Sequence, residues 1–294
     1  MSFGSPYLTL PGFEYIRPKS LQEILELLDR HGEEARILAG GVALISFMKE
    51  RLVAPTYVID IKALKGFNRI EHTPGKGLSI GPTTTMTEIA AYEPVKRRYG
   101  ALHDAASLVG DITLRNRATL VGNICEALPW NDGLASLTLF DAQLTLKSLR
   151  SERLLRVEEF IKGIMETDLH PDEVITSIRI PEPPENSRSI YVKTTSRSEF
   201  SIANIGALVS NPKTPKKRLV RLAYAAAAPT PIRVPEAEDV FRRPGKLSDL
   251  IDEAMPIIIE KVAPMTDMHA SSEYRTHLID ILTRKVLKEL MEGK

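Results

Sequence analysis

A proline-rich segment near the middle of the chain is the feature that most limits how this sequence can fold. Residues 181–186 read Pro-Glu-Pro-Pro-Glu-Asn, a stiff and polar run that suits a linker rather than a helix or a central strand. The chain has 294 residues, whereas one domain typically takes about 100–200 residues. The sequence therefore predicts two domains that meet at this linker.

Helical and strand patterns follow each other irregularly on both sides of the linker. Ser20 and Glu23 form a capping box before a helical repeat of leucine and isoleucine, and Gly32 follows as the expected end of that helix. Further helices are predicted from an N-cap at Thr87 to Tyr92 and over residues 42–52 and 94–109, with two more at the C-terminus; strands are predicted over residues 36–39, 57–61, 78–81, 143–146, 174–180, 202–210 and 218–227. Because strands and helices mix without strict alternation, we expect an α+β fold in both domains.

The overall composition is that of an ordinary globular protein. Hydrophobic residues make up 43% and charged residues 26% of the chain, and the formal net charge of +1 offers no field to attract nucleic acid or an anionic membrane. The first six residues lack the basic and apolar regions of a signal peptide, and the most apolar stretch, 224–228, is far shorter than the roughly 20 residues of a membrane span. We expect a cytoplasmic protein that has no membrane span and binds no nucleic acid.

The chain contains one cysteine, Cys125, and six histidines. One thiol forms no disulfide within the chain and cannot supply the four cysteine ligands of a typical iron–sulfur cluster. No two histidines are three or four residues apart, the spacing that places two ligands on one face of a helix. No metal site is therefore predicted, Cys125 is interpreted as an inert small residue, and any redox chemistry needs an organic cofactor.

Two short glycine-containing turns are the candidate phosphate-binding segments. The first, Leu38-Ala39-Gly40-Gly41-Val42-Ala43, leads from a predicted strand into a helix, so its backbone amides can approach a phosphate without an intervening Cβ. The second, Ala118-Thr119-Leu120-Val121-Gly122-Asn123, adds a hydroxyl and a carboxamide that can close on the other side of a pyrophosphate. Either turn by itself is also compatible with plain packing, which is the more frequent use of paired glycines.

Residues around the second turn each allow two interpretations. Arg115 and Arg117 either neutralise charge near a phosphate or form surface ion pairs with Asp111 and Glu126. Asp132 either begins a helix as its N-cap, which is the plainer role, or contacts a ribityl hydroxyl. The residues alone leave both alternatives open.

The motifs of the common nucleotide-binding and hydrolytic enzymes are missing. No Gly-x-Gly-x-x-Gly follows a strand into a helix, and Gly75-Lys76-Gly77 precedes a strand, where it predicts a hairpin turn. The sequence has no Walker lysine motif, no Gly-x-Ser-x-Gly elbow and no His-Glu-x-x-His. Hydrolase and nucleoside-triphosphatase functions are therefore excluded, and no catalytic residue is assigned.

Several motifs, taken in order, resemble a known family. They are Ala39-Gly40-Gly41, Met48-Lys49 with Arg51-Leu52, the Thr84-Thr85 pair, residues 115–123 with Pro129 and Asp132, Tyr191-Val192-Lys193 with Ser196-Arg197, and residues 272–275. Over nearly its whole length the chain resembles the medium, FAD-binding subunit of carbon monoxide dehydrogenase and its molybdenum-hydroxylase relatives. The equivalent region of xanthine dehydrogenase is similar too.

The resemblance implies a fold and a cofactor. It implies a two-part FAD-binding domain of the vanillyl-alcohol-oxidase type over residues 1–178, with subdomains of about 1–54 and 55–178, followed by a smaller α+β domain over residues 187–294. It also implies FAD, whose pyrophosphate lies between the two turns, with Asp132 near the ribityl–pyrophosphate region and Lys193 and Tyr191 near the isoalloxazine. The implied cofactor-binding residues are Leu38, Ala39, Gly40, Gly41, Val42, Ala43, Thr84, Thr119, Val121, Gly122, Asn123, Asp132, Tyr191 and Lys193.

The resemblance also implies partner subunits. In such relatives, substrate is oxidised at a molybdopterin in a large subunit, and electrons cross the iron–sulfur clusters of a small subunit to reach the flavin. The chain is therefore expected to be an oxidoreductase subunit in a dimer of heterotrimers, from which electrons leave for an external acceptor. A single cysteine fits this role, because such a chain must receive its electrons from another polypeptide.

Three positions depart from the family pattern. Val42-Ala43 stand where side-chain donors usually follow the first glycine pair, Val121 replaces a glycine of the second turn, and Ser201 replaces an aspartate. Valine is hard to accommodate at positive φ, so we expect altered geometry or altered phosphate contact near Val121. Two alternatives to the subunit function are considered: a self-contained flavin oxidase or dehydrogenase of the same broad fold and, because of these departures, a degenerate subunit that no longer binds FAD.

Overall fold

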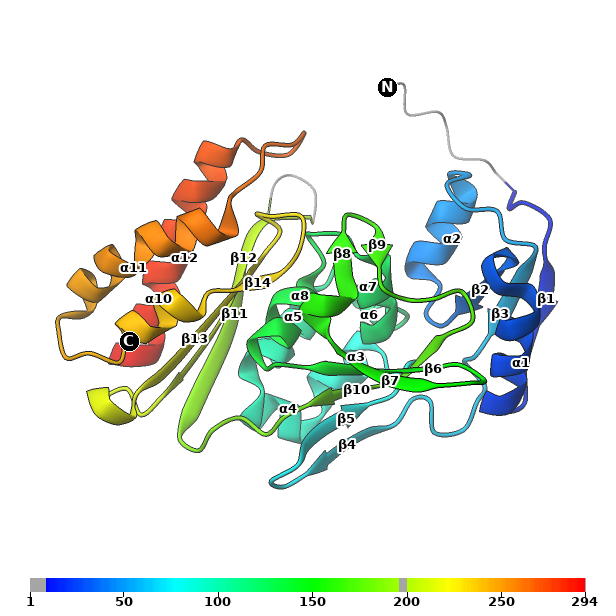
Figure 1. The fold of residues 1–294 in the computed structure, drawn as a ribbon, viewed down its shortest axis with the longest axis horizontal. Coiled ribbons are helices and arrows are strands. Elements are labelled where there is room, and N and C mark those ends of the chain that lie inside the picture. Colours follow the sequence, from blue (N-terminus) through cyan, green and yellow to red (C-terminus); the bar gives the residue numbers. More distant parts are fainter. Residues whose placement is uncertain (1–8, 196–199, 294) are drawn as a thin grey trace.

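The computed structural model describes residues 9–195 and 200–293. Within them the chain forms two bodies, an N-terminal one built on two larger sheets and a C-terminal one built on a third (Figure 1). Helices and strands mix in both bodies, so the expected α+β class is confirmed. Ser196 and Arg197, which contribute to the resemblance, lie outside the described residues.

The first glycine turn leaves a strand of a three-stranded parallel sheet. Its order is β1 (Glu14–Ile16), β3 (Tyr57–Asp60), β2 (Ala35–Leu38), with β1 and β2 both parallel to β3. Strand β3 belongs to this sheet although it follows the predicted subdomain boundary near residue 54. The domain boundaries themselves stay predictions. Because the strands are parallel, the segments that follow β2 and β3 leave the same edge of the sheet.

Helix α1 (Leu21–His31) packs on this sheet and begins and ends where its sequence predicts. The Ser20 hydroxyl accepts the Glu23 amide at 3.1 Å, and Gly32 ends the helix at a φ of 47°. The short 3-10 turn η1 (Gly32–Glu34) then leads into β2. The buried face of α1, which includes Ile24 and Leu28, shares a small apolar core with the sheet. This core holds the strand that enters the first turn.

A five-stranded antiparallel sheet forms the centre of the N-terminal body, in the order β4-β5-β10-β6-β7. Its strands are β4 (Ile70–Thr73), β5 (Gly77–Ile80), β6 (Gln143–Lys147), β7 (Glu152–Arg156) and β10 (Val174–Ile180). The β4–β5 hairpin turns at Gly75-Lys76-Gly77, as the sequence predicts. The short helix α9 (Val157–Phe160) follows β7 and leads into a small two-stranded sheet, β8 (Ile161–Gly163) with β9 (Glu166–Thr167).

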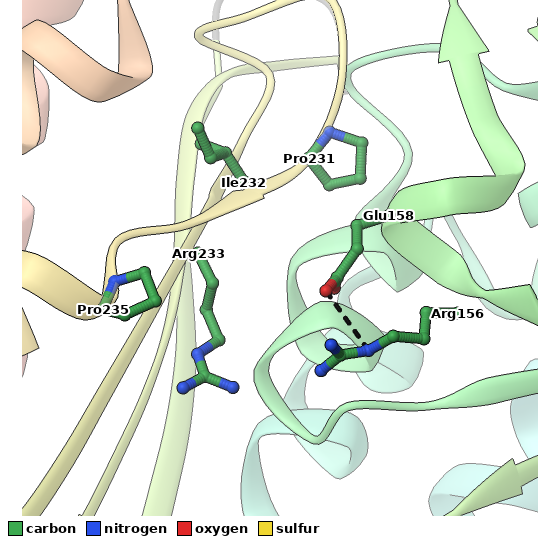
Figure 2. A pocket seen from close by; sticks show the side chains of 6 residues that line it. All are labelled: Arg156, Glu158, Pro231, Ile232, Arg233 and Pro235. Carbon is green, nitrogen blue, oxygen red and sulfur yellow. Dashed lines mark ion pairs between the residues drawn. The ribbon is translucent and has the colours of Figure 1, made fainter.

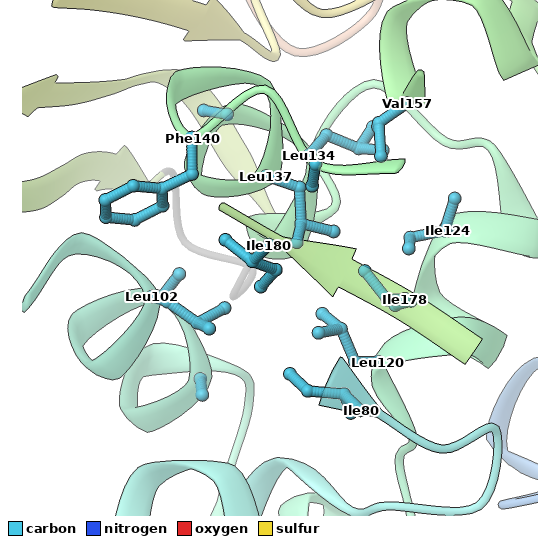
Figure 3. Close-up of a cluster of buried hydrophobic side chains, with 14 of the residues drawn as sticks. Ile80, Leu102, Leu120, Ile124, Leu134, Leu137, Phe140, Val157, Ile178 and Ile180 are labelled. Carbon is cyan, nitrogen blue, oxygen red and sulfur yellow. The ribbon is translucent and has the colours of Figure 1, made fainter. Parts of the chain in front are cut away.

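Short helices pack against this sheet and against one another. They are α3 (Met86–Ala91), α4 (Glu93–Arg98), α5 (Gly100–Leu108), α6 (Ile112–Arg115), α7 (Leu120–Glu126) and α8 (Asp132–Leu139). In the core between them, leucines of α7 and α8 meet isoleucines of β5 and β10, among them Leu120, Leu134, Ile80 and Ile178 (Figure 3). This packing fixes α7, which begins within the second turn, and α8, which follows α7 in the chain.

Two predicted helices differ from the observed ones. The helix expected over residues 94–109 is divided into α4 and α5, because the backbone leaves the helical conformation at Tyr99. At Gly100 a Cβ would lie 2.3 Å from a backbone oxygen of the packed C-terminal sheet, so the chain needs a glycine there. Helix α3 begins after Thr85 rather than Thr87, since the Thr85 hydroxyl forms the capping box.

The C-terminal body is a four-stranded antiparallel sheet backed by helices. Its order is β11 (Ser187–Thr195), β12 (Ser201–Ser210), β13 (Leu219–Ala225), β14 (Ile232–Arg233), and the 3-10 turn η2 (Pro215–Lys217) joins β12 to β13. Helices α11 (Leu247–Val262) and α12 (Ser272–Glu292) lie on the face turned away from the N-terminal body (Figure 1). Within the described residues, three helices follow the last strand where two were predicted, because α10 (Pro235–Val240) starts at a proline that suits a first helical turn.

Strand β12 joins the two bodies. All ten of its residues are buried. Ile205 and Ala207 belong to the core under the C-terminal helices, whereas Leu208 belongs to the core of the N-terminal body. Between them, Gly206 lets the strand approach α8, since a Cβ there would lie 3.2 Å from the Ala135 carbonyl oxygen. The two bodies therefore share a tightly packed apolar boundary.

Candidate functional site

The first glycine turn joins β2 to helix α2 (Val42–Lys49). It packs by backbone contact against residues 115–123, called the second segment, which contain the second turn. A Cβ on Gly40 would lie 2.0 Å from the carbonyl oxygen of Arg117, closer than side chains allow. Gly41 has a φ of 81° and occupies the N-cap position of α2. Gly40 is thus required by the close approach of the second segment, and Gly41 by its left-handed backbone.

The N-terminus of α2 presents bare backbone amides. No side chain caps this eight-residue helix within the described part of the chain, and Val42 and Ala43 bring no polar side-chain atoms to it. The first amides of a helix have no partner inside it and carry a partial positive charge, so they bind anions. As the departure at Val42-Ala43 predicts, the donors at this turn are backbone groups.

The second turn is the capped start of helix α7. The Thr119 hydroxyl accepts the Gly122 amide at 3.1 Å, and the Asn123 carboxamide oxygen accepts the Gly133 amide at 3.1 Å. Val121 lies inside the helix, is absent from the residues with positive φ, and is 7% exposed. Val121 therefore needs no positive φ, because a helical backbone accepts a valine whose side chain enters the core; altered phosphate contact at this position stays a prediction.

A cavity of about 170 Å³ lies between the two turns. This volume is well above the roughly 10–15 Å³ that one buried water requires. Its lining comes from segments that are far apart in the sequence: Ala39, Gly40, Lys62, Thr83, Thr85, Asn116, Arg117 and Thr119. The two candidate turns therefore face one shared space.

The lining of this cavity is polar and cationic. Lys62 and Arg117 are its charged side chains, and the residues that line it include no carboxylate. Thr83 is 8% exposed, and its buried hydroxyl has no hydrogen-bond partner among the described residues. An unpartnered buried donor costs about 1–3 kcal/mol. The cavity thus fits an anionic ligand with several acceptor oxygens, such as a diphosphate.

Sequence reasoning selected some residues around this cavity and missed others. Thr84 does not line it, because its hydroxyl donates to the Arg69 carbonyl oxygen at 3.2 Å; its role in cofactor binding stays a prediction. Lys62 and Thr83 were not selected from the sequence, although the position of Lys62 after a predicted strand could have marked it as a ligand-binding residue. It follows a strand at the carboxyl edge of a parallel sheet, where ligands commonly bind.

The arginines of the second segment bind backbone carbonyls. Arg115 donates to two carbonyl oxygens at 3.0 and 2.8 Å, and Arg117 donates to the Gly40 carbonyl oxygen at 3.4 Å. The ion pairs with Asp111 and Glu126 do not form within the described residues, because Asp111 caps α6 and Glu126 accepts from an asparagine amide. The positive charge of Arg117 therefore stays beside the cavity.

Asp132 is buried where the two bodies meet. Its carboxylate accepts the Tyr191 hydroxyl at 2.6 Å, the Lys193 ammonium at 2.9 Å and the Ser201 hydroxyl at 3.3 Å. Burial raises the pKa of Asp132 above its ordinary value, in spite of these donors. The N-cap of α8 is Asn131, so the interpretation of Asp132 as an N-cap is wrong, and its side chain turns instead to the C-terminal sheet.

Lys193 and Tyr191, predicted beside the isoalloxazine, form a joint between the bodies. Lys193 also donates to the Leu108 carbonyl oxygen at 2.8 Å, and burial raises the pKa of Tyr191 well above its ordinary value. Ser201, which stands where the family pattern has an aspartate, donates its hydroxyl to the same Asp132 carboxylate.

A second cavity, of about 320 Å³, lies between β14 and the corner of β7 and α9; it is lined by Arg156, Glu158, Pro231, Ile232, Arg233 and Pro235 (Figure 2). Arg156 pairs with Glu158 at 3.4 Å, and Arg233 pairs with Glu238 at 2.9 Å. Asp141 joins both arginines, at 2.7 and 2.5 Å. Each arginine of this cavity therefore has carboxylate partners, whereas Arg117 at the first cavity has no ion pair among the described residues.

Among the described residues there is neither a candidate metal site nor a helix that could span a membrane. Across residues 9–195 and 200–293, no group of three or more histidine, cysteine, aspartate or glutamate side chains is placed to hold a metal ion. In the same ranges, no helix combines the length and the apolar character that crossing a bilayer requires. The cationic cavity between the turns is therefore the candidate site from which function is argued.

Comparison with known proteins identifies the class to which this fold and cavity belong. Residues 11–183 match the family described as the FAD binding domain in molybdopterin dehydrogenase. Residues 191–290 match the CO dehydrogenase flavoprotein C-terminal domain. The chain therefore belongs to the FAD-binding subunits of the molybdopterin dehydrogenase family, and the resemblance found in the sequence is confirmed.

Individual relatives agree with this assignment over nearly the whole chain. The glyceraldehyde dehydrogenase medium chain of Sulfolobus acidocaldarius is 31% identical, covering 95% of this chain and 99% of the relative. The xanthine dehydrogenase FAD-binding subunit of Escherichia coli O157:H7 is 30% identical, with 94% of each chain covered. Among solved structures, a chain of the reconstituted CO dehydrogenase from Oligotropha carboxidovorans has a TM-score of 0.90 at 26% identity and covers 97% of this chain and 99% of its own. The chain is thus an oxidoreductase subunit, and its cofactor is FAD.

Proposed function

We propose that this chain is the flavin-carrying electron-transfer subunit of a molybdopterin-dependent hydroxylase or dehydrogenase. It receives electrons that a large molybdopterin subunit passes through the iron–sulfur clusters of a small subunit, and it delivers them to an external acceptor. Bound FAD supplies a centre that accepts single electrons and releases one or two. The single cysteine supports this role, because the chain has too few thiols to hold a cluster itself.

The cavity shared by the two turns is the observation that carries the proposal. Gly40 packs so closely on the Arg117 carbonyl that the first turn and the second segment enclose one space. We infer that the diphosphate of FAD lies there, with the amides of Val42 and Ala43 on one side. Thr119 also lines this space. A diphosphate supplies the acceptor oxygens and the negative charge that this lining requires.

The joint around Asp132 is the second part of the proposed site. We infer that Asp132 lies toward the ribityl chain and that Lys193 and Tyr191 support the wall near the isoalloxazine. In the described structure their polar atoms bind one another, so their part is to hold α8 and β11 in a fixed relation. Direct contacts of FAD with the other predicted residues stay predictions: Leu38, Ala39, Thr84, Val121, Gly122 and Asn123.

We further propose a cytoplasmic dimer of heterotrimers as the working assembly. Support comes from the family description, which names a molybdopterin dehydrogenase, and from relatives described as medium chains, a term that implies a larger and a smaller partner. The partners are then a large molybdopterin subunit and a small iron–sulfur subunit.

The visible spectrum of the purified chain tests this function. We expect flavin absorption bands, no oxidation of an organic substrate by the chain alone, and electron delivery to an acceptor once the large and small subunits are added. Substrate oxidation by the isolated chain would favour a self-contained flavin oxidase. A colourless chain that still binds its partners would favour a subunit that has lost FAD.

A further inference from the structure

Two polar residues that the family resemblance did not select line the cavity between the turns, Lys62 and Thr83. Lys62 follows β3 of the first sheet, and Thr83 follows β5 of the second, so the two residues meet only in the folded chain. We propose that both bind the diphosphate of FAD, Lys62 as a charge partner and Thr83 as a hydroxyl donor. This inference rests on the proposed flavin function.

A buried carboxylate holds Lys62 at the edge of the cavity. Asp60 is 4% exposed; it pairs with the Lys62 ammonium at 2.8 Å and accepts the Lys62 amide at 2.9 Å. Asp60 also accepts the Tyr15 hydroxyl and is in register with Leu38, the residue before the first turn. Lys62 therefore leaves the sheet beside that turn. Because an ammonium has three N–H donors, Lys62 keeps two for a ligand.

The charges around the cavity match those of a dinucleotide diphosphate. Lys62 comes from the first sheet and Arg117 from the second segment, so two cations reach the cavity from different elements. Each phosphate of such a diphosphate carries one negative charge. Asp60 offsets part of the Lys62 charge, but it does not line the cavity. An anion between the two cations therefore gains attraction without facing a carboxylate in the wall.

Thr83 is an independent sign of a ligand at the same place. The hydroxyls of the two threonines that follow it already donate hydrogen bonds: the Thr84 hydroxyl to a carbonyl oxygen at 3.2 Å and the Thr85 hydroxyl to the Glu88 carboxylate at 2.8 Å. The Thr83 hydroxyl is buried and has no partner among the described residues. Buried hydroxyls are nearly always hydrogen-bonded in folded proteins. Because Thr83 lines the cavity, a ligand oxygen bound there would supply the partner that this hydroxyl lacks.

Flavin-fluorescence titration of the full-length, flavin-free chain tests Lys62, with ADP as a competing probe. We expect Lys62→Met to raise the Kd for FAD about tenfold and to weaken competition by ADP by a similar factor, because a charge-assisted hydrogen bond is lost. Lys62→Arg keeps the cation and restores most of the affinity. Lys65→Met, on an exposed lysine outside the cavity, leaves the affinity unchanged. Riboflavin, which has no phosphate, binds the wild type and Lys62→Met equally.

Thr83→Val separates ligand binding from a structural role. It removes the hydroxyl and keeps the shape, so the Kd for FAD rises roughly threefold to tenfold, while the Tm of the flavin-free chain does not fall. A lower Tm with an unchanged Kd would overturn the role of Thr83.

The outcomes also distinguish this inference from the proposed function. Equal FAD affinity in the wild type, Lys62→Met and Lys65→Met overturns the inference and leaves the flavin function intact. A wild-type chain that binds ADP through Lys62 but takes up no FAD supports the phosphate site and overturns the flavin function.

Discussion

The two turns beside the cavity differ in what satisfies the first amides of the helix behind each. At α2, the N-cap is a left-handed Gly41, and no side chain caps the helix within the described residues. At α7, the Thr119 hydroxyl already accepts the Gly122 amide. A bare helix N-terminus is free to bind an anion, whereas a capped one chiefly stabilises its own helix. Glycine content alone therefore does not mark a phosphate contact.

The comparison also shows where the second segment contributes to the cavity. Asn116, Arg117 and Thr119 line it with side chains. The following helix contributes a buried anchor, since Leu120 and Ile124 belong to the core of the N-terminal body. We infer that the first turn acts mainly on the ligand and the second acts both on the ligand and on the fold. Substitutions in each turn test this division.

The largest effect is expected at Gly41. Gly41→Glu should raise the Kd for FAD by roughly 100-fold or more, because it places a carboxylate beside the diphosphate at the bare end of α2. FAD content after purification and a fluorescence titration measure the loss.

Gly66→Glu is the matched control for Gly41→Glu. Gly66 also has a positive φ, of 83° against 81°, and a Cβ there meets nothing within 4 Å. The control shares the positive φ but does not lie at the N-terminus of α2, so it should keep its FAD. If both variants lost FAD to the same extent, strain rather than charge would explain the result.

A smaller effect, on stability rather than affinity, is expected at Val121. Val121→Gly restores the residue usual in the family and should lower the free energy of unfolding by about 2–4 kcal/mol, because a buried side chain is lost and glycine weakens a helix. The Kd for FAD should not improve. Denaturant unfolding and flavin titration measure the two quantities, and a tighter Kd would contradict the structural role of this valine.

The smallest effect is expected from the cap of α7. Thr119→Ala should lower the free energy of unfolding by about 1 kcal/mol, since the Gly122 amide loses its acceptor. Thr119→Ser keeps the hydroxyl and should preserve most of the stability. Urea unfolding of both variants compares them. A loss of FAD as large as that of Gly41→Glu would show that the two turns are equivalent after all.

Local patterns predicted the local structure where the deciding contacts are close in sequence. The Ser20 cap and the Gly32 end of α1 were predicted correctly, as was the hairpin turn at residues 75–77. The division of the helix expected over 94–109 was not predicted. Its cause is the close packing of Gly100 on a strand that lies far ahead in the chain, which no short-range pattern contains.

The candidate site also contains features that the sequence predicted and features that it did not. Glycine at positions 40 and 41 predicted a tight turn, and the helix after it predicted an anion-binding end. The sequence could not predict which polar side chains already have hydrogen-bond partners within the protein. Asp132 was a plausible N-cap by its position, yet its partners come from β11 and β12. Thr83, Thr84 and Thr85 are equivalent in sequence, and only the fold leaves the Thr83 hydroxyl without a hydrogen-bond partner among residues 9–195 and 200–293.

The sequence by itself predicted a division at the proline-rich linker, and it determined two further properties: too few cysteines for a metal cluster, and glycines where two backbones pass closely. These properties depend on residue types and on chain stiffness, which act locally. The tertiary structure alone decided which charges are paired: it placed carboxylates against Arg233, whereas Arg117 lines an open cavity and has no ion pair in the part of the chain that the structure describes. Pairing depends on distances across the fold, because electrostatic and hydrogen-bond energies are set by the atoms that surround a group rather than by its neighbours in the chain.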